Sequence, residues 1–178
     1  MENRKIRVGI THGDINGVGY EVILKTFSDP TMLELCTPVV YGSPKVAAYH
    51  RKTMEIQTSF SIVNSAEEVQ DGRVNVVNCI EEELKVELTK PTPEAGKAAL
   101  AALERALADY REGLFDVLVT APINKHTIQS DAFHFPGHTE YIEERVGEGQ
   151  KALMILLKGD FRVALVTGHV PCVTLPVN

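Results

Sequence analysis

The sequence predicts an α/β fold, in which short apolar strands alternate with amphipathic helices. A strand-like run at 5–11 leads into residues 19–27, where apolar side chains recur at the spacing of one helix face. A second strand-like run at 37–43 is followed by a helical stretch near 46–51. The turn at 159–160 separates two apolar runs, which is typical of a short β-hairpin. A hairpin reverses the chain, so we expect a mixed sheet with flanking helices.

The elements between these runs have local signals of their own. Asp29 and Pro30 predict the end of the first helix. Residues 59–64 and 73–79 are strand candidates, and the polar turn around 70–72 is expected to join them. Strands and helices therefore continue to alternate through the first half of the chain.

The clearest helix covers residues 92–113. Thr92 can cap its start, Pro93 suits the first helical position, and Glu94 suits the positive N-terminal end. Gly113 suits its exit. The apolar face of this helix is built mainly of alanine, which predicts close packing on a sheet or on another helix.

Apolar runs in the last third of the chain predict three further strands. Residues 115–124 predict a buried strand that breaks at Ala121 and Pro122. Residues 151–158 and 161–167 form the two arms of the predicted hairpin, and Val163 to Val166 of the second arm are expected to be buried because that run is apolar.

Composition excludes several classes of protein. Of 178 residues, 44% are hydrophobic and 24% charged, which is ordinary for a soluble globular protein, and no apolar run approaches the length of a membrane span. The net charge of −6, without a block of Lys or Arg, argues against a nucleic-acid surface. The start of the chain does not resemble a secretory signal, so we expect a cytoplasmic protein. Its three widely spaced cysteines are expected to be reduced: Cys36, Cys79 and Cys172.

Residues able to do chemistry follow four of the predicted strands, where open α/β sheets bind ligands. The glycine-rich segment at 11–21 matches neither the dinucleotide nor the Walker pattern, so by itself it predicts only a tight turn between strand and helix. Lys125 follows the strand at 115–124 and suits a phosphate or carboxylate, although a solvated lysine is the alternative. His138 and Thr139 open a helix, where they suit an anionic group or a local cap. His169 follows the last strand.

The histidines do not form a recognisable metal site in the sequence. A catalytic metal needs about three protein ligands and an open position. His138 and His169 both lie near strand ends, but His50 is expected in an amphipathic surface stretch, and His126 and His134 are expected in loops. The residues alone therefore supply one or two plausible ligands and no complete set.

Four segments together resemble a known family. They are GITHGDINGVGYE, VLVTAPINKHTI, FPGHTEYIEE and RVALVTGHVP, in this order. The chain is similar in them to the 4-hydroxythreonine-4-phosphate dehydrogenase family, and the resemblance covers essentially the whole chain. His12 and Tyr20 depart from it, because the family commonly has proline at both positions. Family members are also about twice as long, so residues 1–178 are expected to form the N-terminal portion of a two-domain protein whose C-terminal half is absent.

The resemblance implies a fold and a reaction. The fold is that of isocitrate and isopropylmalate dehydrogenases, as a homodimer with shared active sites. The reaction uses NAD to oxidise 4-phosphooxy-L-threonine at C3, with decarboxylation to 3-amino-2-oxopropyl phosphate, in the biosynthesis of vitamin B6 (pyridoxal 5'-phosphate). A divalent metal, Zn, Mg or Co, assists, and the partner is thus a phosphorylated small molecule.

The resemblance also implies roles for single residues. His138 and Thr139 match a substrate-binding pair, and His169 matches the first of three metal-binding histidines, with the other two in the absent half. Lys125 matches a lysine expected to support catalysis, and Asp14 is a weaker candidate. No residue of this chain is assigned to NAD.

Two alternatives stay open at this point. The chain can be a truncated half that folds without catalysing, or a phosphate acetyltransferase, which has a related architecture and needs no metal histidines. Acetyl-coenzyme A dependence without NAD dependence would favour the second alternative.

Overall fold

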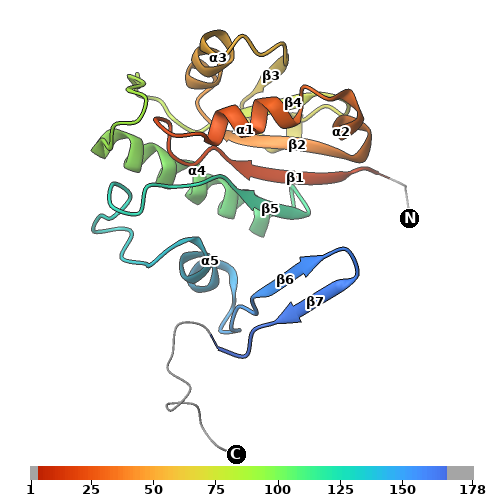
Figure 1. The fold of residues 1–178 in the computed structure, drawn as a ribbon, viewed down its shortest axis with the longest axis vertical. Helices are drawn as coiled ribbons and strands as arrows, with labels where there is room; N and C mark the ends of the chain where they lie inside the picture. The colour runs from red at the N-terminus through yellow and green to blue at the C-terminus, as the bar shows by residue number, and fades with distance from the viewer. Residues whose placement is uncertain (1–3, 168–178) are drawn as a thin grey trace, which may run out of the picture. The chain divides into compact units, whose positions relative to one another are not determined.

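The structure, a computed structural model, describes residues 4–167 (Figure 1). The chain divides into two compact units, one ending at His138 and the other beginning at Thr139. No helix among residues 4–167 has both the length and the apolar character that crossing a membrane requires.

The first unit is built on a five-stranded sheet with the order β3-β4-β2-β1-β5. All four neighbouring pairs are parallel. The strands are β1 (Ile6–Thr11), β2 (Cys36–Gly42), β3 (Phe60–Val63), β4 (Val74–Asn78) and β5 (Val117–Thr120). The helices are α1 (Gly19–Thr26), α2 (Pro30–Leu35), α3 (Pro44–Thr53), the 3-10 turn η1 (Ala66–Glu68) and α4 (Pro93–Arg111).

Helices cover both faces of this sheet (Figure 1). On one face, Val40 of β2 belongs to a buried cluster with residues of α1 and α3, including Ile23 and Val46. On the other face, the next side chain along β2, Tyr41, packs in a cluster with alanines of α4. Successive residues of a strand point to opposite faces, so β2 contributes to both halves of the core.

Helix α4 follows its sequence signals closely. The Thr92 hydroxyl accepts a hydrogen bond from the backbone N–H of Ala95 at 3.3 Å, and Pro93 is the first helical residue. The predicted alanine face is buried. Farther along the helix, buried Asp109 accepts hydrogen bonds from the Tyr41 hydroxyl and from Arg105 Nε, both at 2.9 Å. This polar contact fixes α4 against β2.

Two local predictions need correction. Asp29 and Pro30 do end α1, but they also begin α2, whose first turn the Asp29 carboxylate caps by accepting from the backbone N–H of Thr31 at 2.9 Å. Strand β5 was expected to be buried, yet it is an edge strand whose Val117 and Val119 are 45% and 49% exposed. The apolar run was read correctly as a strand, and its place at the edge depends on strand order.

The second unit contains most of α5 (His138–Val146) and the hairpin of β6 (Ile155–Lys158) and β7 (Phe161–Ala164). The predicted hairpin is confirmed, with Lys158 opposite Phe161. The prediction that its second arm is buried was wrong for the described residues: β7 is exposed along its length, and Val166 beyond it is 96% exposed. No other described strand pairs with these two.

The α/β class with flanking helices is confirmed. The two strand directions, expected in one mixed sheet, are divided between a parallel sheet and a separate antiparallel hairpin. Cys36 and Cys79 are free thiols as expected, and Cys172 lies outside the described residues.

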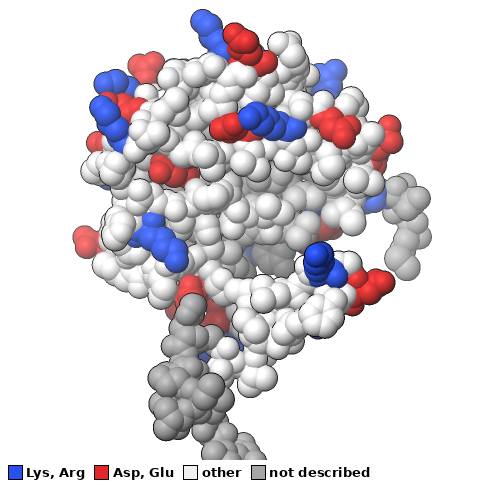
Figure 2. All heavy atoms as spheres, viewed as in Figure 1, with Lys and Arg blue, Asp and Glu red and all other residues white. Residues whose placement is uncertain are grey.

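Charged side chains alternate in sign on the face in Figure 2, where Lys and Arg lie among Asp and Glu. No broad basic patch is visible on that face of the described residues.

Candidate functional site

Two of the segments that carry candidate site residues meet at the carboxyl ends of β1 and β5. Thr11 and Thr120 are partners in the parallel register of the two strands. Beyond them, the backbone N–H of Ala121 donates to the Thr11 carbonyl at 3.1 Å, and that of Asp14 donates to the Pro122 carbonyl at 2.9 Å. The loop at 12–18 and the loop at 121–128 therefore lie against each other. They lie beyond the carboxyl ends of the strands, where such folds bind ligands.

Close backbone approach explains Gly13 of the first loop and Gly19, the first residue of α1. Gly13 has φ +72°, and a Cβ on it would lie 2.3 Å from the Pro122 carbonyl oxygen. A Cβ on Gly19 would lie 2.0 Å from the carbonyl oxygen of His12. Any side chain at either position would push the two loops apart or unwind the start of α1.

Asn16 ties the first loop to the segment before α4. Its side chain, 2% exposed, donates to the Lys90 carbonyl at 2.9 Å and to the Thr92 hydroxyl at 3.2 Å. The side-chain oxygen of Asn16 accepts from the backbone N–H of Glu87 at 2.8 Å, and the backbone carbonyl of Asn16 accepts from the backbone N–H of Thr89 at 2.9 Å. Sequence reasoning did not single out Asn16, because its partners lie about 70 residues away.

A column of buried rings lies under the same loop. The rings of His12 and Tyr20 stack with centroids 5.2 Å apart and planes 6° apart, and Tyr20 stacks in turn on His50 at 5.5 Å. The Tyr20 hydroxyl accepts from the backbone N–H of Ser43 at 2.8 Å and donates to the Ser43 carbonyl at 3.1 Å. The two departures from the family pattern, His12 and Tyr20, are thus in direct contact.

Gly42 makes room for this column. A Cβ at Gly42 would lie 2.3 Å from the Tyr20 hydroxyl and 2.4 Å from Cδ2 of His12. The prediction that His50 lies on the surface was wrong, since His50 is 0% exposed. Val46 and Ala47, four and three residues earlier on α3, are buried as well, so His50 belongs to the apolar face of that helix.

Burial keeps the imidazoles of the column neutral. Burial lowers the pKa of His12 to about 4, and both of its ring nitrogens lack a hydrogen-bond partner among the described residues. Burial also lowers the pKa of His50, and it raises the pKa of the Tyr20 hydroxyl. None of the three rings is charged at neutral pH.

The second loop presents Lys125 to solvent. Asn124 organises this loop, because its side-chain oxygen accepts from the backbone N–H groups of His126 at 3.0 Å and Thr127 at 3.3 Å. This turn holds Asn124 inward and leaves Lys125 exposed. An exposed ammonium beyond a strand end suits an anionic ligand.

His138 lies close enough to Lys125 to respond to its charge. His138 is partly buried at the first position of α5, and its pKa is lowered by burial and, to a smaller extent, by the Lys125 ammonium. Thr139, the next residue of the helix, is exposed and begins the second unit. Lys125 and His138, two of the predicted site residues, are thus near enough to interact electrostatically. A neutral imidazole and an ammonium can both donate hydrogen bonds to a phosphate.

The structure does not test the predicted metal ligand. His169 is outside the described residues. Within residues 4–167, no three His, Cys, Asp or Glu side chains are grouped so as to hold a metal ion. The described residues alone do not fit a catalytic metal, which needs about three protein ligands.

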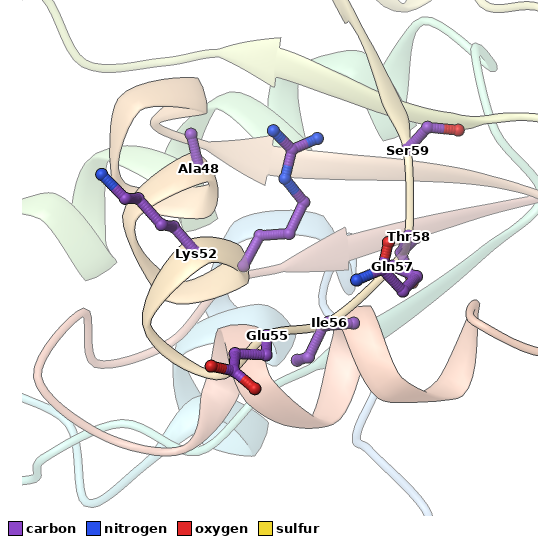
Figure 3. Close-up of a pocket in the computed structure, with 8 residues that line it drawn as sticks. Ala48, Lys52, Glu55, Ile56, Gln57, Thr58 and Ser59 are labelled. Carbon is purple, nitrogen blue, oxygen red and sulfur yellow. The ribbon is translucent and has the colours of Figure 1, made fainter.

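One hollow of the first unit is a separate feature. It has a volume of about 620 Å³ and lies between the end of α3 and the chain entering β3, with Lys52, Glu55 and Thr58 among its lining (Figure 3). Helix α3 leads from the carboxyl end of β2 toward the amino end of β3. This hollow therefore lies near the amino ends of the strands, whereas Lys125 follows the carboxyl end of β5. Arg51, which also lines this hollow, lies over the Phe60 ring, with its guanidinium carbon 5.2 Å from the ring centroid.

Similarity to known proteins identifies the family. Residues 34–177 match the family described as pyridoxal phosphate biosynthetic protein PdxA. The chain belongs to the PdxA family. The interpretation drawn from the four sequence segments is therefore confirmed.

Relatives in the PdxA family support this assignment. The chain is 74% identical over 171 residues to a 4-hydroxythreonine-4-phosphate dehydrogenase of Bacteroides thetaiotaomicron, covering 96% of this chain and 47% of that protein. It is 31% identical over 171 residues to a putative D-threonate 4-phosphate dehydrogenase of Oceanobacillus iheyensis, covering 94% and 51%. The chain spans about half the length of the curated relatives that it matches.

A solved PdxA relative has the same fold. The crystal structure of a 4-hydroxythreonine-4-phosphate dehydrogenase from Burkholderia phymatum superposes with a TM-score of 0.83 at 27% identity, over 96% of this chain and 52% of that one. The isocitrate dehydrogenase-like architecture expected from the sequence is confirmed for the part that this chain covers.

Proposed function

We propose that the complete protein oxidises 4-phosphooxy-L-threonine at C3, using NAD, and releases CO₂ to give 3-amino-2-oxopropyl phosphate, a step of vitamin B6 biosynthesis. The observation that carries this proposal is the 74% identity to a 4-hydroxythreonine-4-phosphate dehydrogenase across nearly the whole chain. In this reaction a hydride would pass from C3 to NAD⁺ and the hydroxyl proton to a base. The C1 carboxylate would then leave as CO₂, and its bonding electrons would remain at C2, which takes up a proton to give the product.

Lys125 and His138 are proposed to act on the anionic substrate. The charge of Lys125 attracts the phosphate or the carboxylate, and the charge already reaches His138. The imidazole of His138 is neutral at neutral pH, because its pKa is lowered. It can therefore donate an N–H to the substrate without repelling the Lys125 ammonium. Thr139, exposed beside His138 in the first turn of α5, is proposed as a further hydrogen-bond donor to the substrate.

NAD and a divalent metal are proposed as cofactors. When bound, NAD supplies the hydride acceptor and a divalent cation, Zn, Mg or Co, supplies Lewis-acid assistance at the reacting oxygen. His169 is proposed as one ligand of the cation. Since residues 4–167 contain no group of three suitable side chains, further ligands are expected from the part of the full-length protein outside this chain.

We also propose the wider organisation. Residues 1–178 would form the N-terminal portion of a two-domain enzyme, which acts in the cytoplasm as a homodimer with shared active sites. The relatives' length supports the missing half. The hairpin β6–β7 supports it too, because two exposed strands carrying apolar residues on both faces need a covering layer to be stable.

A second candidate substrate is D-threonate 4-phosphate. The relative from Oceanobacillus iheyensis, 31% identical, is named a putative dehydrogenase of this compound. The two substrates share the phosphate, the C3 hydroxyl and the carboxylate, and they differ at C2. Lys125 and His138 suit the shared phosphate, so they do not discriminate between the two.

The test measures NADH formation by the complete protein with each substrate, with and without a chelator. We expect turnover of 4-phosphooxy-L-threonine that chelation abolishes. Faster turnover of D-threonate 4-phosphate would reassign the substrate, and acetyl-coenzyme A turnover without NADH formation would favour the acetyltransferase alternative. The 178-residue chain alone is expected to be inactive.

Variants of the complete protein test the residue roles. Lys125→Met should lower kcat/KM by about tenfold to a hundredfold, the value of one charge-assisted hydrogen bond. Lys97→Met, which removes an exposed lysine of α4, is the control. His169→Ala should abolish metal-dependent turnover. Equal activity of the Lys125 and Lys97 variants would contradict the role of Lys125.

A further inference from the structure

His50 makes one specific contact that reaches toward the candidate site. Its Nε2–H donates to the carbonyl of Ile15 at 2.8 Å. Both residues are 0% exposed, and Ile15 is the middle of the loop at 12–18. A buried carbonyl without a donor destabilises the folded state, because no hydrogen bond replaces those it made to water. This hydrogen bond therefore constrains the loop strongly.

The ring column fixes His50 itself. Tyr20 stacks on one side of the His50 ring with centroids 5.5 Å apart, and Tyr49 meets it edge-on at 5.7 Å. The Tyr20 hydroxyl is held at both the N–H and the carbonyl of Ser43, the residue that caps α3. The imidazole therefore has little freedom to turn away from Ile15.

The loop transmits its position to the second loop. Asp14, next to Ile15, donates its backbone N–H to the Pro122 carbonyl at 2.9 Å, and Gly13 packs against the same carbonyl. Pro122 begins the short turn that carries Lys125. A continuous chain of contacts thus leads from buried His50 and Ile15 through partly buried Asp14 to that turn.

We infer that His50 is a positioning residue, which fixes the loop at 12–18 and, through it, the turn that presents Lys125. His50 lies on α3 and acts only through Ile15. Its effect on turnover rests on the function proposed above, whereas its effect on the loop does not. The two effects are therefore measured separately.

The first experiment follows amide hydrogen exchange of the complete protein in a peptide covering 13–18. His50→Leu removes the donor and should speed exchange in this peptide about tenfold. His50→Gln keeps a side-chain N–H at a similar distance from the backbone of α3, so it should restore most of the protection. Val46→Ala is the matched control, because it removes buried volume from the same helix and leaves the hydrogen bond from His50 to Ile15 in place.

Two results would overturn the inference about the loop. One is equal exchange at 13–18 in the His50→Leu and Val46→Ala variants after matching for global stability, since His50 would then act only through the fold. The other is the absence of rescue by His50→Gln. Either result is readable whether or not the protein oxidises the proposed substrate.

The second experiment measures steady-state kinetics of the same variants. His50→Leu should raise the KM for the phosphorylated substrate about tenfold with a smaller change in kcat, because it displaces Lys125, which binds the substrate. The KM of His50→Gln should be close to that of the parent. Faster loop exchange with an unchanged KM would overturn the link to Lys125. If the parent forms no NADH, the proposed function fails, and the exchange data alone decide the role of His50 in the loop.

Discussion

His12 should make the stability of the first unit depend on pH. Its imidazole is 0% exposed, neither ring nitrogen has a partner among the described residues, and burial lowers its pKa from the ordinary 6.5 to about 4. Between these two values the unfolded chain binds a proton that the folded chain does not. The stabilisation is therefore complete above pH 6.5 and is lost as the pH falls toward 4.

The magnitude follows from these two pKa values. One pKa unit corresponds to about 1.4 kcal/mol, so lowering the pH from about 7.5 to about 5 should reduce the free energy of unfolding by about 2 kcal/mol through His12 alone. Burial also lowers the pKa of His50 and of His138, and both add to the loss in the same direction. The contribution of His12 must therefore be isolated by a variant.

Urea unfolding followed by circular dichroism at several pH values provides the assay. His12→Phe keeps a ring against Tyr20 but cannot titrate, and His12→Leu is a second variant in case the larger ring does not fit beside Gly42. Each should lose about 2 kcal/mol less than the parent over this pH range. Parallel pH curves for the parent and both variants would refute the reasoning, because His12 would then bind its proton equally in the folded and unfolded states.

Three further substitutions test the packing around the site. Asp109→Ala should cost about 2 kcal/mol in urea unfolding, because it leaves the buried Tyr41 hydroxyl unpaired, and adding Tyr41→Phe should recover part of the loss. Gly96→Ala should cost about 3 kcal/mol in calorimetry, because its Cβ would lie 1.8 Å from the Thr127 carbonyl oxygen; an unchanged stability would show that the loop yields freely. Thr92→Ala should lower the stability measured by thermal unfolding by about 1 kcal/mol through loss of the α4 cap, and Thr92→Ser should not.

The sequence predicted best those elements whose signals are local. Thr92 and Pro93 mark the start of α4 whatever surrounds them, and apolar periodicity indicated α1 correctly. The exposure of β7 and the edge position of β5 could not be predicted in the same way. Periodicity says that a strand is apolar, but strand order and the covering layers decide whether it is buried.

The same distinction applies to the candidate site. Lys125 and His138 could be proposed from the sequence because Lys125 follows a predicted strand and His138 opens a predicted helix. Asn16 was missed, since its partners come from a distant segment. His50 was missed although a signal existed: it follows Val46 by four residues, so helical spacing alone assigns it to the buried face.

The position of β1 between β2 and β5 has a consequence for synthesis of the chain. Val8 pairs with Val117, so one neighbour of β1 is made about 110 residues after it. At the usual speed of translation that interval lasts roughly 5 to 20 seconds. During this time the nascent chain carries a central strand with one unpaired edge, which is the kind of edge that another chain can join. Ribosome-associated chaperones that hold the chain until residue 120 has emerged should therefore raise the yield of correctly folded protein.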